Sequence, residues 1–93
     1  MKKIASAVVI SEQDNVATAT RNIAAGEKIT VNIGNKSTEL LIKDNIRFLH
    51  KFASREIKKG ENVLKYGAVI GEATQNISPG EHVHTHNVRS LRT

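Results

Sequence analysis

The chain has 93 residues, a length that suits one domain with a modest core. Hydrophobic residues make up 39% of it, too many for a disordered chain, and Phe48, Phe52 and Tyr66 are its only aromatic residues. Lysine and arginine number 14 against 9 acidic residues, and the resulting charge of +5 favours an anionic partner. Because side chains for base stacking are scarce, nucleic acid is disfavoured, and an acidic small molecule is the better candidate.

The start of the chain and its lack of cysteine bear on location. Residues 4–10 form an apolar run after two lysines, but a secretion signal needs at least about 7 apolar residues, and Ser11-Glu12 ends this run at once. We therefore expect a first core strand here. With no cysteine there is no disulfide or thiolate metal site, which is compatible with a cytoplasmic protein. No stretch is long enough to span a membrane.

The middle of the chain predicts further strands. Residues 29–33 and 36–42 flank Gly34-Asn35, a two-residue hairpin signal. Residues 40–52 roughly follow a helical stripe, but Asp44-Asn45 in their centre favours a bend between strands. Residues 65–71 place two glycines around a short apolar run, as in a tight loop followed by a strand.

One phrase occurs three times. Residues 19–29 read ATRNIAAGEKI, residues 53–63 read ASREIKKGENV, and residues 73–83 read ATQNISPGEHV. The spacing between copies is irregular, which excludes a solenoid and indicates one local turn used repeatedly in a β fold. Each copy ends an extended piece at an isoleucine and reverses at a glycine suited to positive φ. We expect the glutamate after each glycine to accept hydrogen bonds from turn amides.

Histidines alternate in residues 81–87, which read EHVHTHN. If this segment is a strand, His82, His84 and His86 share one face, and the outer two lie about 13 Å apart. Three such residues do not readily close on one ion, although a neighbouring pair does so with ligands from elsewhere. The pattern therefore favours a site for an anion such as a substrate carboxylate over a metal cage, and a solvated polar face is the simplest alternative.

Several segments together resemble a known family. They are Asp14-Asn15-Val16-Ala17-Thr18, His50-Lys51-Phe52-Ala53, Lys65-Tyr66-Gly67 with Ile70-Gly71, and Gly80-Glu81-His82-Val83-His84-Thr85-His86-Asn87. In this order they resemble the SAF-type N-terminal domain of the altronate/galactarate dehydratase family, which also occurs as the separate alpha subunit of sulfolactate sulfo-lyase. The resemblance covers residues 8–88. It implies an all-β, SAF-like β-clip of folded-over antiparallel ribbons, here a single domain over residues 1–93.

The resemblance also implies a function and a set of site residues. It implies a lyase subunit, inactive alone, that helps a large catalytic partner bind and dehydrate an acidic substrate of the altronate or galactarate type. Iron(II) or manganese(II) is implied for the assembled enzyme, and a homo-oligomer is left open. The residues expected in the site are His50 and His84 as catalytic groups, Lys51, Lys65, Tyr66 and His86 for the substrate, and His82 with His84 for the metal.

One departure from the family is Leu49, which stands where a glycine usually precedes His50-Lys51. The loss of that glycine puts the backbone approach to the ligand, and hence the substrate class, in question. The alternative function is a stand-alone SAF-type module that binds a sugar acid or metal without catalysis. Association with a large subunit separates the two interpretations.

Overall fold

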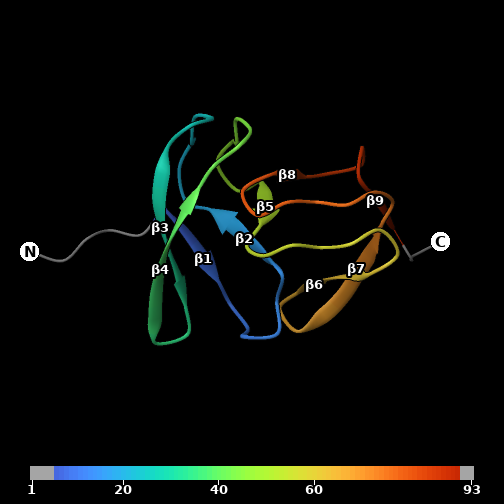
Figure 1. Ribbon diagram of the computed structural model, residues 1–93. Helices are drawn as coiled ribbons and strands as arrows, with labels where there is room; N and C mark the ends of the chain where they lie inside the picture. The colour runs from blue at the N-terminus through green and yellow to red at the C-terminus, as the bar shows by residue number, and fades with distance from the viewer. Residues whose placement is uncertain (1–5, 91–93) are drawn as a thin grey trace, which may run out of the picture.

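The computed structural model describes residues 6–90, and every regular element in that range is a β-strand (Figure 1). The predicted all-β class is therefore confirmed. The described part of the chain has no helix with the length and apolar character needed to cross a membrane. The strands are β1 (Ala7–Val9), β2 (Val16–Ala19), β3 (Lys28–Ile33), β4 (Lys36–Leu41), β5 (Lys51–Ala53), β6 (Asn62–Lys65), β7 (Ala68–Ala73), β8 (His82–Val83) and β9 (Val88–Ser90).

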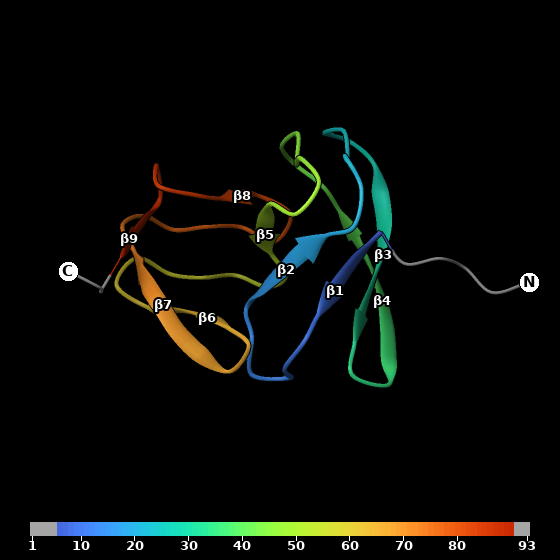
Figure 2. The ribbon, with the colours of Figure 1, turned by 180° about the vertical axis from the view of Figure 1, so that it is seen from behind.

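The strands form two sheets. A six-stranded sheet has the order β4-β3-β1-β2-β5-β8, and a three-stranded sheet has the order β6-β7-β9. Figures 1 and 2 show the β3–β4 hairpin on one side of the molecule and the β6–β7 hairpin on the other, with β2 and β5 between them. The pairs of strands are antiparallel as expected, except that β1 and β3 pair in parallel. The parallel pair arises because β2 reverses the chain before β3 returns to the opposite edge of β1.

The local predictions for the first half of the chain agree with the structure. Strand β1 lies within the apolar run of residues 4–10, of which residues 4 and 5 lie outside the described range. Strands β3 and β4 flank Gly34-Asn35 as a hairpin, with φ of 58° at Gly34. Residues 42–50 bend between strands and form no helix, as Asp44-Asn45 suggested.

Each copy of the repeated phrase forms the same turn. Gly26, Gly60 and Gly80 have φ values of 93°, 89° and 88°, in the region that favours glycine. A fourth copy, which the repeat pattern did not reveal, occupies residues 42–52, and Leu49 stands at its glycine position with φ of 70°. We name the turns A (residues 23–27), B (residues 46–50), C (residues 57–61) and D (residues 77–81).

The four turns associate as two pairs. In the pair of turns A and B, Ile23 and Ile46 exchange N–H to carbonyl hydrogen bonds of 2.8 Å in both directions. In the pair of turns C and D, Ile57 and Ile77 exchange equivalent bonds of 2.9 and 2.7 Å. Each turn therefore satisfies the exposed backbone of its partner, as residues in an antiparallel ladder do.

Side-chain amides strengthen the pair of turns A and B. The N–H of Ala25 donates to Asn45 Oδ1 at 2.9 Å, and the N–H of Phe48 donates to Asn22 Oδ1 at 2.8 Å. These bonds are reciprocal, because each asparagine directly precedes the isoleucine of its own turn and reaches across to the other.

The pair of turns C and D keeps only one such bond. The N–H of Lys59 donates to Asn76 Oδ1 at 2.9 Å. The reciprocal bond cannot form, because Pro79 has no N–H to donate. Glu56 occupies the corresponding asparagine position.

The repeated glutamates act within the turns, as predicted. Each accepts a hydrogen bond from the N–H of the residue three positions before it: Ala24 to Glu27 at 2.7 Å, Lys58 to Glu61 at 2.6 Å, and Ser78 to Glu81 at 2.9 Å. A carboxylate thus caps the turn in all three recognised copies.

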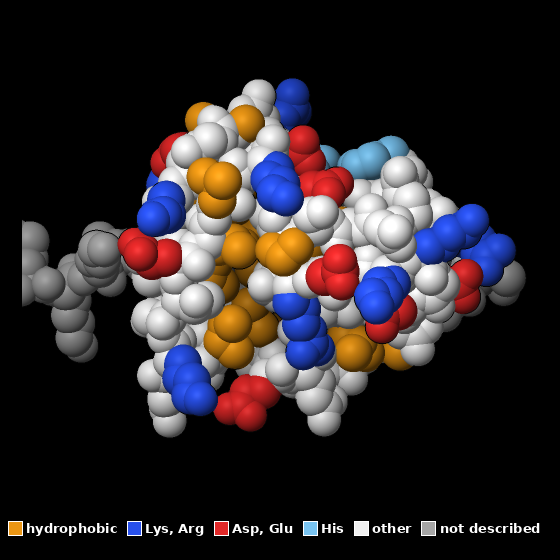
Figure 3. Space-filling model, in the orientation of Figure 1, with side chains coloured by type: hydrophobic (Ala, Val, Ile, Leu, Met, Phe, Trp, Pro, Cys, Tyr) orange, Lys and Arg blue, Asp and Glu red, His pale blue; other side chains and the backbone are white. Residues whose placement is uncertain are grey.

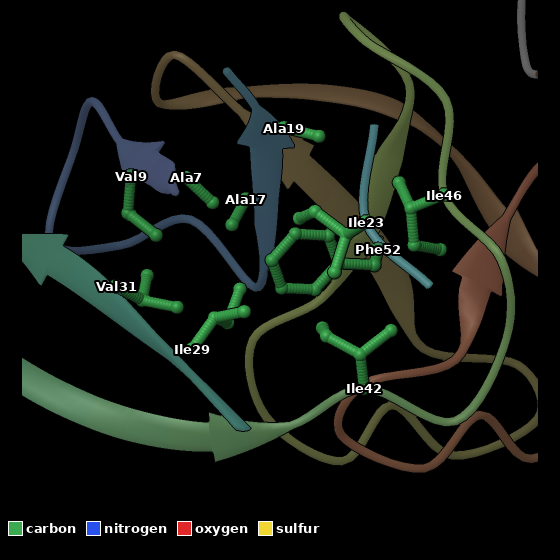
Figure 4. Packing of buried hydrophobic residues seen from close by; sticks show 10 residues of the cluster. All are labelled: Ala7, Val9, Ala17, Ala19, Ile23, Ile29, Val31, Ile42, Ile46 and Phe52. Atoms are coloured by element: carbon green, nitrogen blue, oxygen red, sulfur yellow. The ribbon is translucent and has the colours of Figure 1, made fainter. Parts of the chain in front are cut away.

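The turn pairs enclose two apolar clusters. The first, shown in Figure 4, consists of Ala7, Val9, Ala17, Ala19, Ile23, Ile29, Val31, Ile42, Ile46 and Phe52. The second consists of Val16, Ala53, Ile57, Val63, Ala73, Ile77 and Val83. Strands β2 and β5 belong to both: the cross-strand pair Ala17 and Phe52 faces the first cluster, and the adjacent pair Val16 and Ala53 faces the second.

Gly80 and Gly60 provide a matched test of this packing. A Cβ at Gly80 would overlap the carbonyl oxygen of Leu41, whereas a Cβ at Gly60 would meet nothing within 4 Å. Both positions have the same positive φ, so alanine costs about 1–2 kcal/mol of backbone strain at each. Overpacking adds about 1–3 kcal/mol at Gly80 alone. We expect Gly80→Ala to lower the free energy of unfolding, measured with urea, clearly more than Gly60→Ala; equal losses would contradict the close approach.

Candidate functional site

The predicted histidine strand is shorter than its sequence suggests. Strand β8 consists of His82 and Val83, and residues 84–87 form a turn. The expectation of His82, His84 and His86 alternating along one extended strand is therefore wrong beyond Val83.

A buried asparagine explains this turn. Asn87 is 1% exposed, and its Oδ1 accepts the N–H of His84 at 3.0 Å while its Nδ2 donates to the carbonyl of His82 at 2.8 Å. The carbonyl of His84 also accepts the N–H of Val88 at 3.0 Å. A fully bonded amide inside the turn provides the backbone partners that a continued strand would have supplied.

The turn gathers the histidines more tightly than a strand would. The ring centroids of His82 and His86 are 5.7 Å apart, which replaces the strand-based estimate of about 13 Å. His82 and His84 lie 5.4 Å apart, and His50 stacks on both at 5.2 and 5.6 Å. Figure 3 shows these side chains together at the upper edge of the molecule. We call His50, His82, His84 and His86 the histidine cluster.

The histidine cluster is not arranged as a complete metal site. The ring of His50 lies at interplanar angles of 22° and 17° to those of His82 and His84, so the three rings are roughly parallel. His50 Nδ1 and His82 Nε2 are 3.1 Å apart and share a hydrogen bond. Within residues 6–90, no three ligand-type side chains are placed to hold an ion. Ligation by His82 and His84 stays a prediction that requires ligands from another chain or segment.

The surroundings of His82 in the histidine cluster lower the pKa of its ring. Partial burial lowers its pKa, and the charges that His50, His84 and His86 acquire on protonation lower it further. Asp44 opposes this shift, and its carboxylate also accepts the backbone N–H of His82 at 2.9 Å. At neutral pH the ring of His82 is therefore a neutral donor and acceptor.

Lys51 lies on the opposite side of the β5–β8 pair from His82, because it pairs in register with Val83 while His82 pairs with Phe52. A hollow of about 200 Å³ opens beside it. The residues that line the hollow are Lys51, Ile70, Val83, His84, Thr85, Val88 and Ser90. Burial lowers the pKa of Lys51, and the positive charge of Lys65 lowers it further. Within residues 6–90, no carboxylate forms an ion pair with its ammonium.

Lys65 and Tyr66 do not line this hollow, and a buried acid holds the turn that they lead into. The carboxylate of Asp14, 4% exposed, accepts the N–H groups of Tyr66 and Gly67, both at 2.8 Å. Tyr66 has φ of 56°, and the Nζ of Lys65 lies 4.8 Å from the centroid of its ring. The structure thus brings Lys65 to Lys51 and Tyr66 to Lys65.

Three residues that position the site were not singled out from the sequence. Asp14 holds the Tyr66 turn, Asp44 holds strand β8, and Asn87 holds the turn that begins at His84. Asp14 and Asn87 stand inside the segments that carry the family resemblance, which was the available signal. The fourth turn copy had a weak one, because the dipeptide Asn-Ile occurs in turns at residues 22–23, 45–46 and 76–77 but also at residues 32–33 within β3.

Fold and site together define a small all-β module whose described histidines gather on strand β8 and the turns beside β5 and β8, with Lys51 on β5. Residues 5–91 match the family model described as the altronate/galactarate dehydratase SAF domain, and the chain belongs to this family. It is 40% identical to an altronate dehydratase of Bacillus subtilis over 91% of this chain and 16% of that protein. It is 39% identical to an altronate dehydratase of Escherichia coli over 89% of this chain and 16% of the relative.

A second kind of relative is close to this chain in length. The chain is 39% identical to the (2R)-sulfolactate sulfo-lyase subunit alpha of Chromohalobacter salexigens, over 75% of this chain and 77% of that subunit. The chain thus spans about a sixth of the altronate dehydratases and most of the sulfo-lyase subunit.

The histidine cluster predicts a pH dependence of stability. Because the folded pKa of His82 lies below its unfolded value near 6.5, its contribution to stability is complete above pH 6.5. As pH falls from there through the folded pKa, the unfolded chain takes up a proton first and that contribution is lost. We expect His82→Gln to flatten the fall in unfolding free energy as the pH is lowered below about 6.5. In NMR titrations, His86→Gln should raise the pKa of His82, and an unchanged value would contradict the coupling.

The Asp14 carboxylate predicts a second stability effect. Asp14→Ala removes the acceptor of the Tyr66 and Gly67 amides, and hydrogen bonds to charged groups contribute about 1.5–3 kcal/mol. We expect the unfolding free energy to fall by at least about 2 kcal/mol. The neighbouring exposed Gln13→Ala should change it by less than about 0.5 kcal/mol. Similar values for the two variants would show that Asp14 does not hold this turn.

Proposed function

We propose that this chain is the small subunit or N-terminal module of a lyase that eliminates water, or sulfite, from an acidic hydroxy-acid substrate. In this proposal it binds the substrate at an interface with a large catalytic partner. The names of its relatives support both parts, since they are altronate dehydratases and subunits of a sulfo-lyase. The basic composition and the uncompensated Lys51 support an acidic substrate.

The position of His84 carries the proposal. Its ring contacts His50 in the histidine cluster, and it also lines the hollow beside Lys51. A substrate whose carboxylate lies against Lys51 would therefore have imidazoles within reach of its neighbouring carbon atoms.

The chemistry of elimination fits these side chains. Removal of the proton next to a carboxylate needs a base, and departure of the leaving group needs an acid. His50 and His84 are the proposed groups for these proton transfers, since neutral imidazole accepts a proton and imidazolium donates one. Lys51 would bind the carboxylate with the charge of Lys65 nearby, and Tyr66 and His86, which do not line the hollow, stay predicted substrate contacts. Iron(II) or manganese(II) stays a prediction for the assembled enzyme, because residues 6–90 do not converge as a complete metal site.

A stand-alone sugar-acid-binding module is the second candidate. The hollow beside Lys51 supports it equally well, because carboxylate binding there does not require a catalytic partner. Only association with a large subunit and turnover in the mixture separate the two functions.

The proposal is tested by assaying the chain with and without its candidate large subunit. Altronate, galactarate and sulfolactate are the substrates, under reducing conditions with iron(II) or manganese(II). We expect turnover only in the mixture, and His50→Ala or His84→Ala should lower kcat by about 100-fold or more, the usual contribution of a general acid or base. Lys36→Ala, on the exposed start of β4, is the control that should keep full activity.

Two outcomes would overturn the proposal. Turnover by the chain alone would show that its site is complete without a partner. Association without loss of activity in either histidine variant would remove both residues from the chemistry.

A further inference from the structure

Turn B differs from the other turns at the residue that should cap it. In turns A, C and D a glutamate carboxylate accepts the N–H three residues earlier, at 2.6 to 2.9 Å. In turn B the equivalent donor is the N–H of Arg47, and the capping position is His50. The backbone is otherwise retained, because the N–H of His50 donates to the carbonyl of Arg47 at 2.9 Å, as the N–H of Glu61 does to Lys58.

His50 does not replace the missing carboxylate. Its Nδ1 shares a hydrogen bond with His82 at 3.1 Å, and its ring stacks on those of His82 and His84. Among the described residues, no acceptor bonds to the N–H of Arg47, and no acidic side chain forms an ion pair with its guanidinium. Turn B therefore keeps the donor of a carboxylate-binding turn without the carboxylate.

A hollow lies at this place. Turns A and B border an open depression of about 310 Å³, whose lining residues are Asn22, Ile23, Ala24, Glu27, Asn45, Ile46 and Arg47. Ala24 and Arg47, the equivalent donors of the two turns, both line it. The charge of Glu27 on this wall is compensated, because its carboxylate pairs with Arg21 at 2.9 Å and accepts the N–H of Ala24 at 2.7 Å. Arg47 is the uncompensated charge of the hollow.

We propose that turn B binds the carboxylate of a small organic acid through the backbone N–H and the guanidinium of Arg47. The three capped turns show that a carboxylate fits this backbone, and the bound group would occupy the place that a glutamate at position 50 would reach. The carboxylate would therefore lie beside the ring of His50. As a part of the catalytic site, this inference rests on the proposed function, in which His50 transfers a proton; carboxylate binding by turn B itself does not.

The test uses ¹H–¹⁵N spectra of the full 93-residue chain titrated with sodium D-gluconate, with D-glucitol as the uncharged analogue. We expect gluconate to shift the Arg47 amide in a saturable way and glucitol to leave it unchanged.

His50→Glu is the decisive variant. It restores the missing cap, so the Arg47 amide should move toward the shifts of Ala24, Lys58 and Ser78 without ligand. Its Kd for gluconate should rise at least about tenfold, as expected when a charge-assisted hydrogen bond is lost. Phe48→Glu adds the same charge to an exposed neighbour without capping the turn, and it should change Kd by less than about threefold.

Three results would overturn the inference. The first is an Arg47 amide that does not respond to gluconate, and the second is a His50→Glu variant that binds as the wild type does. The third is a shift and protection of the Arg47 amide on adding the large subunit alone, which would assign the turn to an acidic side chain of the partner. Because binding is read without turnover, failure of the lyase proposal would appear separately, as an inactive mixture with an intact Arg47 response.

Discussion

The reciprocal bonds between paired turns are the constraint on which the rest of this structure depends. A turn that reverses at a positive φ leaves backbone groups unpaired, and a small domain with few aromatic side chains has little apolar burial with which to offset them. Here each turn satisfies its partner, Ile23 with Ile46 and Ile57 with Ile77. The same contacts place those isoleucines in the two apolar clusters, so backbone satisfaction and core formation occur together.

Much of this architecture could be predicted from the sequence because it depends on local patterns. Gly34-Asn35 predicted its hairpin, and the repeated phrase predicted three turns capped by glutamate. Turn B was not predicted because it lacks the glycine and the glutamate of the repeated phrase. Leu49 takes a φ of 70° that its residue type disfavours, and His50 stands in place of the glutamate. The parallel pairing of β1 with β3 also escaped, since it depends on chain order in space and no local pattern encodes it.

The candidate site was predictable in its residues but not in its geometry. The alternating histidines predicted a strand, whereas hydrogen bonds from buried Asn87 bend the chain after Val83 and bring His86 back to His82. His50, remote in sequence, joins them because β5 pairs with β8. Leu49 does not disturb this arrangement, because its φ is positive like those of the glycines in the other turns. The departure from the family therefore changes the side chain at this position and leaves the turn in place.

The central pair of strands has a consequence for fidelity of folding. In β2 and β5, adjacent residues face different clusters, with Ala17 and Phe52 on one side and Val16 and Ala53 on the other. In a sheet with one buried face, a shift of one residue moves the apolar side chains of a strand to the solvent face. Here such a shift would direct Phe52 into the second cluster, which contains alanine, valine and isoleucine but no aromatic residue, and would leave a void in the first. A shift in the pairing of β2 with β5 would thus disrupt the packing of both apolar clusters. The two clusters together fix this register, and with it the positions of the histidines on β8 and beside β5.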